Sequence, residues 1–292
     1  MQIVESRSST PDSHDIGGSV RQESPYDPGD RGVLRVWRGE IPLDIVQDQW
    51  DKIAERYLEE FRDRRDTTYA NVEMPEVVKL LNRKVDGAIV LDAGCGAARF
   101  IPELFYNRKP KQVIGVDISG RMLELAEGHL QDKPFRDRVK LIHCAVEECS
   151  SHIESGSVDL ILALNVMHLV PGLDQTMREF NKLMKPEGRL IVSTKHPKRN
   201  EWYARSSGQR YEPGPNNWYL EYWPGSGSEA VWVRYMTVAQ WNNLFTRYNF
   251  VTSIYEPAPT ETVLHDYPEL LVEHQAKGSG LILVGTKYAD VP

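Results

Sequence analysis

The most constraining feature of this 292-residue chain is a glycine-containing turn directly after a short apolar run. Residues 88–91 are Ala-Ile-Val-Leu, and Asp92-Ala93-Gly94-Cys95-Gly96 follows them. About one helix length later, a second apolar run ends in Gly115-Val116-Asp117-Ile118. This order is typical of a nucleotide-binding βαβ unit, in which glycines let the backbone approach the ligand and an acid binds ribose hydroxyls. We therefore expect a nucleoside ligand.

The turn is not expected to cradle a phosphate. A dinucleotide fingerprint spaces its glycines as G-x-G-x-x-G, but position 99 is arginine here. No Gly-Lys-Ser or Gly-Lys-Thr triplet follows to hold a triphosphate.

The turn, the second motif and Met122-Leu123 after it resemble those of the class I S-adenosylmethionine-dependent methyltransferases, of the Rossmann-like, small-molecule type. The resemblance covers residues 41–287. It implies S-adenosyl-L-methionine as cofactor and S-adenosyl-L-homocysteine as product. The cofactor-binding residues that we predict are Tyr57, Asp92, Gly94, Gly96, Asp117, Ile118, Cys144, Ala145 and Asn165.

Two positions depart from the family pattern. Ala98 stands where the family usually has its third glycine, and Cys144 stands where an acid often receives the adenine amino group. Adenine recognition must then depend on backbone groups, on apolar packing, or on Glu147 or Glu148.

Apolar runs alternate with amphipathic stretches, which predicts an α/β fold. The fold that we expect is doubly wound, with a mostly parallel seven-stranded sheet, an antiparallel last strand, a helical N-terminal cap and an aromatic-rich lid insertion. Strands are predicted at residues 88–91, 113–118, 140–145, 158–165, 189–194, 251–255 and 281–286. The expected parts are a flexible tail (1–32), the cap (33–86), the cofactor-binding core (87–195), the lid (196–236) and the C-terminal part of the core (237–292).

The predicted lid contains nine aromatic residues, interleaved with glycine and proline. A loop of this length is usually functional or disordered, and its aromatic content argues against disorder. We interpret it as a wall over the acceptor, and an aromatic mini-core without ligand contact is the alternative. The substrate-binding residues that we predict are Tyr69, Trp218, Tyr222, Trp223, Arg234 and Tyr235.

Two histidines follow predicted strands at the carboxyl edge of the sheet. His168 comes after the fourth strand and His196 after the fifth. Histidine titrates near neutral pH and can take a proton from an attacking nucleophile, so both are candidate catalytic bases. A structural hydrogen bond is the alternative for each.

Composition excludes several other classes. A net charge of -7 disfavours a nucleic-acid partner. No apolar run is long enough to predict a membrane span, and no signal pattern is found at the N-terminus, so we expect a cytoplasmic protein. The three cysteines have no metal-ligand spacing, and no metal is predicted. The sequence leaves a homodimer open.

The expected function is methyl transfer to a small-molecule acceptor at oxygen, nitrogen or carbon, in specialised metabolite biosynthesis. Two alternatives stay open: a protein of the same fold that binds the cofactor but catalyses a non-methylating cyclisation or rearrangement, and a non-catalytic binding protein.

Overall fold

The structure is a computed structural model, and it describes residues 3–6, 34–62, 68–81, 85–106, 108–199, 214–222 and 230–288. Its main sheet has seven strands in the order β10-β11-β7-β6-β3-β4-β5. Their bounds are β3 (Ile89–Ala93), β4 (Gln112–Asp117), β5 (Val139–His143), β6 (Val158–Leu164), β7 (Met184–Thr194), β10 (Phe250–Tyr255) and β11 (Leu281–Lys287). Strand β11 is antiparallel to both of its neighbours, and the other four pairings are parallel. The predicted sheet is confirmed.

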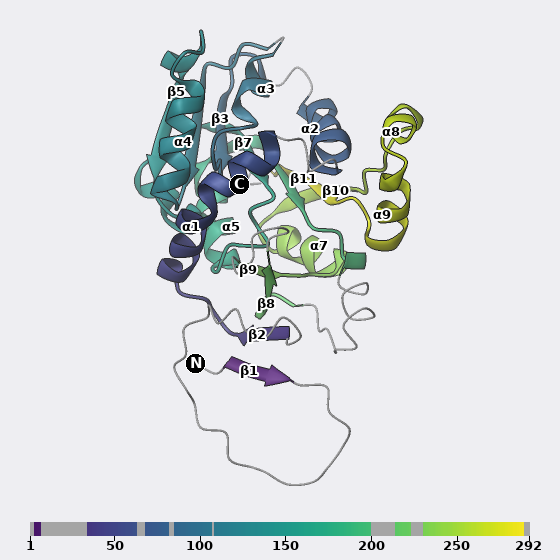
Figure 1. The fold of residues 1–292 in the computed structure, drawn as a ribbon. Coiled ribbons are helices and arrows are strands. Elements are labelled where there is room, and N and C mark those ends of the chain that lie inside the picture. Colours follow the sequence, from purple (N-terminus) through teal and green to yellow (C-terminus); the bar gives the residue numbers. More distant parts are fainter. Residues whose placement is uncertain are drawn as a thin grey trace, which may run out of the picture.

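Helices cover both faces of this sheet, because its central strands are apolar on both sides (Figure 1). One face packs against α5 (Leu173–Leu183) and α7 (Val238–Arg247), through Phe180, Trp241 and Phe245 among others. The opposite face packs against α2 (Met74–Leu81), α3 (Ile101–Phe105) and α4 (Gly120–Leu130). Two further helices, α8 (Glu261–Asp266) and α9 (Glu269–Lys277), lie between β10 and β11 in the sequence.

A second sheet has four antiparallel strands in the order β1-β2-β8-β9. They are β1 (Ile3–Ser6), β2 (Leu34–Arg38), β8 (Asn217–Tyr222) and β9 (Ala230–Arg234). Here the structure differs from the sequence-based expectation: β1 lies within the predicted tail, and β8 and β9 lie within the predicted lid. The physical reason is two-sided burial in β8, where Trp218 packs in one apolar cluster and Tyr219 in another.

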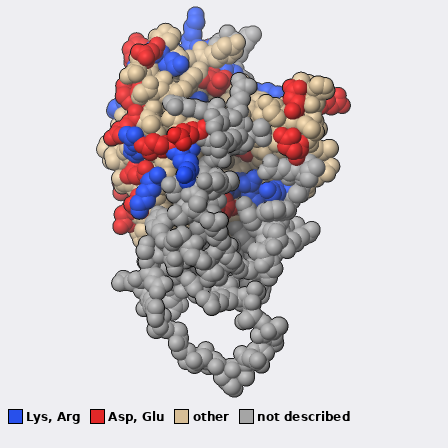
Figure 2. Space-filling view, viewed as in Figure 1, with Lys and Arg blue, Asp and Glu red and all other residues tan. Residues whose placement is uncertain are grey.

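Helix α1 (Leu43–Arg62) connects the two sheets. Its Val46 packs with Trp218 and its Ile53 with Tyr219. Figure 2 shows acidic and basic side chains interspersed on the face viewed. One ion pair, between Glu55 of α1 and Arg121 of α4, joins these two helices. Such an exposed pair contributes little to stability, so apolar packing holds α1 in place.

Short helical turns complete the described structure: a π-helix (Tyr69–Glu73) and two 3-10 helices (Arg136–Arg138 and Val146–Ser151). Within the described residues, no helix combines the length and the apolar content that a membrane span requires.

Candidate functional site

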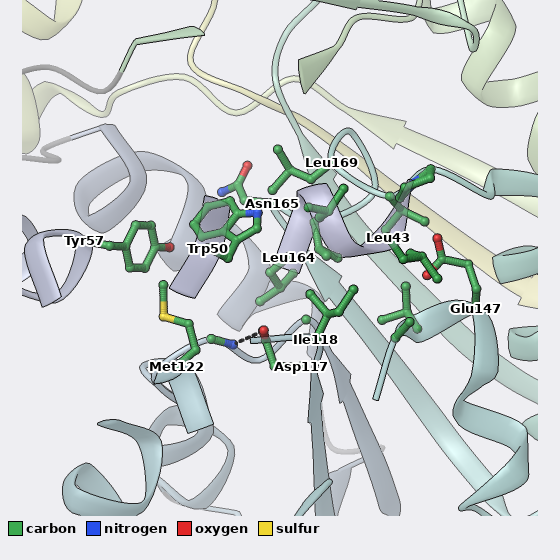
Figure 3. A pocket seen from close by; sticks show the side chains of 18 residues that line it. Leu43, Trp50, Tyr57, Asp117, Ile118, Met122, Glu147, Leu164, Asn165 and Leu169 are labelled. Carbon is green, nitrogen blue, oxygen red and sulfur yellow. Dashed lines mark hydrogen bonds between the residues drawn. The ribbon is translucent and has the colours of Figure 1, made fainter. Parts of the chain in front are cut away.

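A pocket of about 630 Å³, partly open to solvent, lies at the carboxyl ends of β3, β4 and β6, beneath α1 (Figure 3). Both its size and its position at the strand ends are typical of a small-molecule site in an α/β fold. Of the predicted site residues, those that line it are Tyr57, Gly94, Gly96, Asp117, Ile118, Ala145 and Asn165. The structure thus brings together residues from the turn after β3, the end of β4, the loop after β5, the end of β6 and α1.

The turn after β3 forms the floor of the pocket, and it needs an unusual backbone. Gly94, Gly96 and Ala98 have φ angles of 71°, 52° and 58°, in the left-handed region. A Cβ atom on Gly94 would lie 2.3 Å from Cγ2 of Val166, so only glycine fits there. Ala98, which replaces the family's third glycine, has the same left-handed conformation and is fully buried. Such a conformation is strained for alanine.

Asp117, at the end of β4, stabilises this turn through a hydrogen bond. Its Oδ2 accepts a hydrogen bond from the backbone N–H of Gly96 at 2.8 Å, and its Oδ1 accepts one from Ser119 at 2.9 Å. Each carboxylate oxygen keeps a lone pair for a ligand hydroxyl. Burial raises the pKa of Asp117 to about 6, although the two N–H donors oppose the shift.

Ser119 connects Asp117, at the end of β4, to helix α1. Its hydroxyl donates to Oδ1 of Asp51 at 2.6 Å, and it also caps α4 by accepting from the backbone N–H of Met122 at 3.0 Å. The position of α1 above the pocket is therefore set by polar contacts as well as by packing.

Asp92 lies below the turn, in β3. It is 3% exposed and is absent from the pocket lining. Burial and the charge of Asp117 raise the pKa of Asp92 to about 7. Two carboxyl groups with raised pKa values thus lie close together beside the pocket, which is common at functional sites.

Arg99 lies between two tyrosines and is itself outside the pocket lining. Its Nη2 donates to the hydroxyl of Tyr57 at 3.0 Å, and its guanidinium carbon is 5.1 Å from the Tyr57 ring centroid and 4.9 Å from that of Tyr69. Tyr57 lines the pocket, whereas Tyr69 is buried outside its lining. Burial raises the pKa of Tyr69, so its phenol stays protonated. Sequence reasoning noted Arg99 only as a departure from a phosphate loop.

Asn165 follows β6 and has a φ of 55°. Its backbone N–H donates to both the carbonyl and the hydroxyl of Ser193 at 3.0 Å. Its Nδ2 donates to Oε2 of Glu73 at 3.1 Å. Glu73, which the sequence did not single out, packs against Gly280, where a Cβ atom would lie 2.7 Å from its Cδ.

Cys144 differs from the other predicted cofactor residues. Its thiol lies in the buried core, and it does not line the pocket. Burial raises the pKa of Cys144 to about 11, so the thiol is neutral. The next residues, Ala145, Val146 and Glu147, line the pocket in its place.

Both predicted catalytic histidines are buried and lie outside the pocket lining. Nδ1 of His168 is 3.3 Å from the hydroxyl of Thr194, and burial lowers the pKa of His168 well below its ordinary value. Nδ1 of His196 accepts from the backbone N–H of Lys198 at 3.0 Å, and its Nε2 is 3.2 Å from Glu256. The ring of His196 packs against Gly278. The structure does not bring the two histidines into hydrogen-bond contact.

The predicted substrate residues lie in the second sheet and just after it. The guanidinium carbon of Arg234 is 3.8 Å from the Trp218 ring centroid, and its Nη2 donates to the carbonyls of Val170 and Pro171. Burial lowers the pKa of Arg234 to about 9. Tyr235 packs against Tyr219. The pocket lining contains none of Trp218, Arg234 and Tyr235. The Tyr222 side chain and Trp223 lie outside the described residues.

Residues 84–223 match the family model described as a methyltransferase domain. Over these residues the chain carries a methyltransferase domain. The family resemblance predicted from the glycine turn and Asp117 is thereby confirmed. The match takes in β3 to β8, which include the strands that build the pocket.

Curated proteins are similar to part of this chain, and one of the two described next is named as a methyltransferase. A malonyl-[acyl-carrier protein] O-methyltransferase from Legionella pneumophila is 31% identical over 37% of this chain and 36% of its own. A relative from Haemophilus influenzae is 29% identical over 52% of this chain and 58% of its own. The chain thus spans less than two thirds of these curated relatives.

Solved structures share the fold. An S-adenosylmethionine-dependent methyltransferase from Mesorhizobium loti superposes with a TM-score of 0.57 at 20% identity, covering 73% of this chain and 96% of the other. A Burkholderia thailandensis 1,6-didemethyltoxoflavin-N1-methyltransferase, with that compound and S-adenosylhomocysteine bound, superposes with a TM-score of 0.54 at 16% identity. That match covers 88% of this chain and 96% of the other.

Proposed function

We propose that this chain binds S-adenosylmethionine in the pocket beneath α1 and transfers a methyl group to a small organic acceptor. The observation that carries the proposal is the direct hydrogen bond between the glycine turn and Asp117. It places a bare backbone segment and a carboxylate side by side at the edge of an apolar pocket, which suits a nucleoside.

The residues present fit this cofactor. Gly94 lines the pocket with backbone atoms alone, and a Cβ atom there would collide with Val166. Asp117 would bind the ribose hydroxyls, and Ile118 and Ala145 would contact the adenine. Arg99 lies behind the pocket lining and donates to Tyr57 of that lining, and it would supply the positive charge for the methionine carboxylate.

When bound, the cofactor supplies a methyl group activated by a sulfonium. The chain has to align the acceptor with that carbon and to exclude water. Trp50 and Tyr57 of α1 line the pocket from above, with their rings 5.6 Å apart in an edge-to-face arrangement, and so shield it from solvent.

The acceptor is proposed to be a small molecule of specialised metabolism; one solved structure of the same fold is named for a small-molecule substrate, 1,6-didemethyltoxoflavin. We place it beside the carboxyl end of β7, bordered by the described part of the predicted lid, residues 196–199, 214–222 and 230–236; residues 200–213 and 223–229 of that lid lie outside the described structure. If the acceptor is a phenol, alcohol or amine, His168 or His196 takes its proton. A carboxylate acceptor needs no base.

The test is to incubate the protein with methyl-labelled S-adenosylmethionine and a panel of phenols, amines, carboxylic acids and acidic carbon compounds. Mass spectrometry should find one acceptor class that gains one methyl group, together with equimolar S-adenosylhomocysteine. Conversion of a substrate without a gain in mass would favour the cyclisation or rearrangement alternative. Cofactor binding without turnover of any substrate would favour a binding protein.

A further inference from the structure

One wall of the pocket is a loop directly before α5, residues 168–172, which we call the wall loop. The residues that it contributes to the pocket lining are Leu169, Val170 and Pro171. Its last residue, Gly172, donates a backbone hydrogen bond to Oε1 of Glu147 at 3.1 Å. In Figure 3 Glu147 lies at the end of the pocket opposite Tyr57. The wall loop therefore reaches that end of the pocket.

Arg234 of β9 binds the wall loop from the second sheet. Its backbone N–H donates to the carbonyl of His168 at 2.8 Å. Its Nη2 donates to the carbonyls of Val170 and Pro171, the second at 2.9 Å. Arg234 is 1% exposed and is absent from the described pocket lining. It can therefore act on a ligand in this pocket only through the wall loop.

The guanidinium of Arg234 is itself fixed by stacking. Its carbon lies 3.8 Å from the ring centroid of Trp218, which is fully buried. The indole N–H of Trp218 donates to the carbonyl of Gly39 at 2.9 Å, so the ring has a defined orientation. A planar guanidinium can stack on a ring and donate from its edge at the same time, which a lysine ammonium cannot do. The contact with the wall loop thus depends on the shape of Arg234 as well as on its charge.

Two buried groups of opposite charge hold the wall loop, Arg234 and Glu147. Burial raises the pKa of Glu147, and the charge of Arg234 opposes that rise. Burial lowers the pKa of Arg234 to about 9, and the charge of Glu147 opposes that fall. Removal of one group alone would leave the other buried without its counter-charge. The charge of Arg234 and its hydrogen bonds to the loop therefore have to be tested separately.

We propose that Arg234 is a positioning residue for the bound cofactor, because it fixes the wall loop and so shapes the pocket at the end opposite Tyr57. The inference rests on the proposed function, since it takes S-adenosylmethionine as the ligand that the wall loop contacts. A wall that is already in place spares the ligand the cost of ordering it. Arg234 also links the pocket to β9, which contributes no residue to the described lining.

The first test measures the affinity for S-adenosylhomocysteine by calorimetry in two variants that keep the charges balanced. Arg234→Lys keeps the cation and loses the planar group, and its reference is the natural chain. Arg234→Met combined with Glu147→Gln removes both ions, and its reference is Glu147→Gln alone. Each variant should bind roughly 10-fold to 100-fold more weakly than its reference. Arg247→Lys, at an exposed arginine, is the matched control and should bind like the natural chain.

The second test is hydrogen exchange on the natural chain, and it needs no variant. S-adenosylhomocysteine should slow amide exchange in the wall loop and also in β9, which the ligand does not touch. Strand β10, at the far edge of the main sheet, is the internal control and should not change.

The other results overturn the inference. Variants that bind as tightly as their references would show that Arg234 only balances the charge of Glu147, while the proposed function stands. Exchange in β9 that does not slow would have the same meaning, even if neither Arg234 variant folds. If the natural chain does not bind S-adenosylhomocysteine, the proposed function is wrong and this inference with it.

Discussion

The backbone N–H of Gly96 lies 2.8 Å from Oδ2 of Asp117, so the turn after β3 and the carboxylate at the end of β4 form one unit. The two groups are 21 residues apart in the sequence. A change at Asp117 should therefore affect the loop and the ligand together.

Replacing Asp117 with alanine should weaken S-adenosylmethionine binding by roughly 1.5 to 3 kcal/mol or more, because a charge-assisted hydrogen bond is lost. Calorimetry on the natural chain and the variant measures the difference. Asp132→Ala, at an exposed aspartate, is the control and should leave the affinity unchanged. Unchanged affinity in a folded Asp117→Ala protein would show that Asp117 does not bind the ribose.

Binding of S-adenosylmethionine should strengthen as the pH rises through about 6 to 7. The pKa values of Asp117 and Asp92 are raised to about 6 and about 7, so both groups are partly protonated in this range. A cationic ligand nearby favours their ionised forms and expels protons, which changes the affinity by up to about tenfold per pH unit for each proton released. Calorimetry in two buffers of different ionisation enthalpy measures the proton release. A pH-independent affinity between pH 5 and 8 would contradict the prediction.

The free energy of unfolding should depend on pH through Asp92. Burial raises the pKa of Asp92 from 3.8 to about 7 in the folded chain. A raised carboxyl pKa means that the stability contribution is complete below the unfolded value and is lost as the pH rises through the folded one. Asp92→Asn should therefore match the natural chain near pH 4 and exceed it near pH 8, by on the order of a few kcal/mol. Denaturant titrations at several pH values measure this, and a constant difference between the two proteins would argue against it.

Ala98→Gly should be tolerated better than Ala97→Gly. Ala98 has a φ of 58°, whereas Ala97 has no positive φ, and both side chains are buried. Glycine relieves the strain at position 98 and only adds backbone freedom at position 97, so the two unfolding free energies should differ by about 1 kcal/mol. Thermal or chemical unfolding of both variants checks this. Equal losses at the two positions would show that Ala98 carries no strain.

At least one of His168 and His196 should act as base when the acceptor must lose a proton. The matching histidine-to-glutamine variant should lower turnover by about 10²-fold to 10⁴-fold, with S-adenosylhomocysteine affinity nearly intact. His152→Gln, at an exposed histidine, is the control. Full turnover at saturating acceptor in both single variants and the double variant would leave neither histidine as base.

Local patterns in the sequence were sufficient to predict the main sheet and the motif residues. Gly94, Gly96 and Asp117 occupy fixed places at strand ends, and the period of the buried strands is visible in the apolar runs themselves. By contrast, glycines and prolines flank β8 and separate it from β9 in the sequence, which obscures both strands. The strand character of β8 depends on pairing with β2, nearly 180 residues away, and β9 pairs in turn with β8. The indole N–H of Trp218 also donates to the carbonyl of Gly39, just after β2.

The sequence by itself determined the βαβ unit, because a turn that must approach a ligand requires glycine and leaves a recognisable spacing. Only the tertiary structure decided which polar side chains surround the pocket. Arg99 meets Tyr57 across 42 residues, and Glu147 meets Gly172 across 25. Such contacts arise when separate elements pack together, and no periodicity along the chain encodes them.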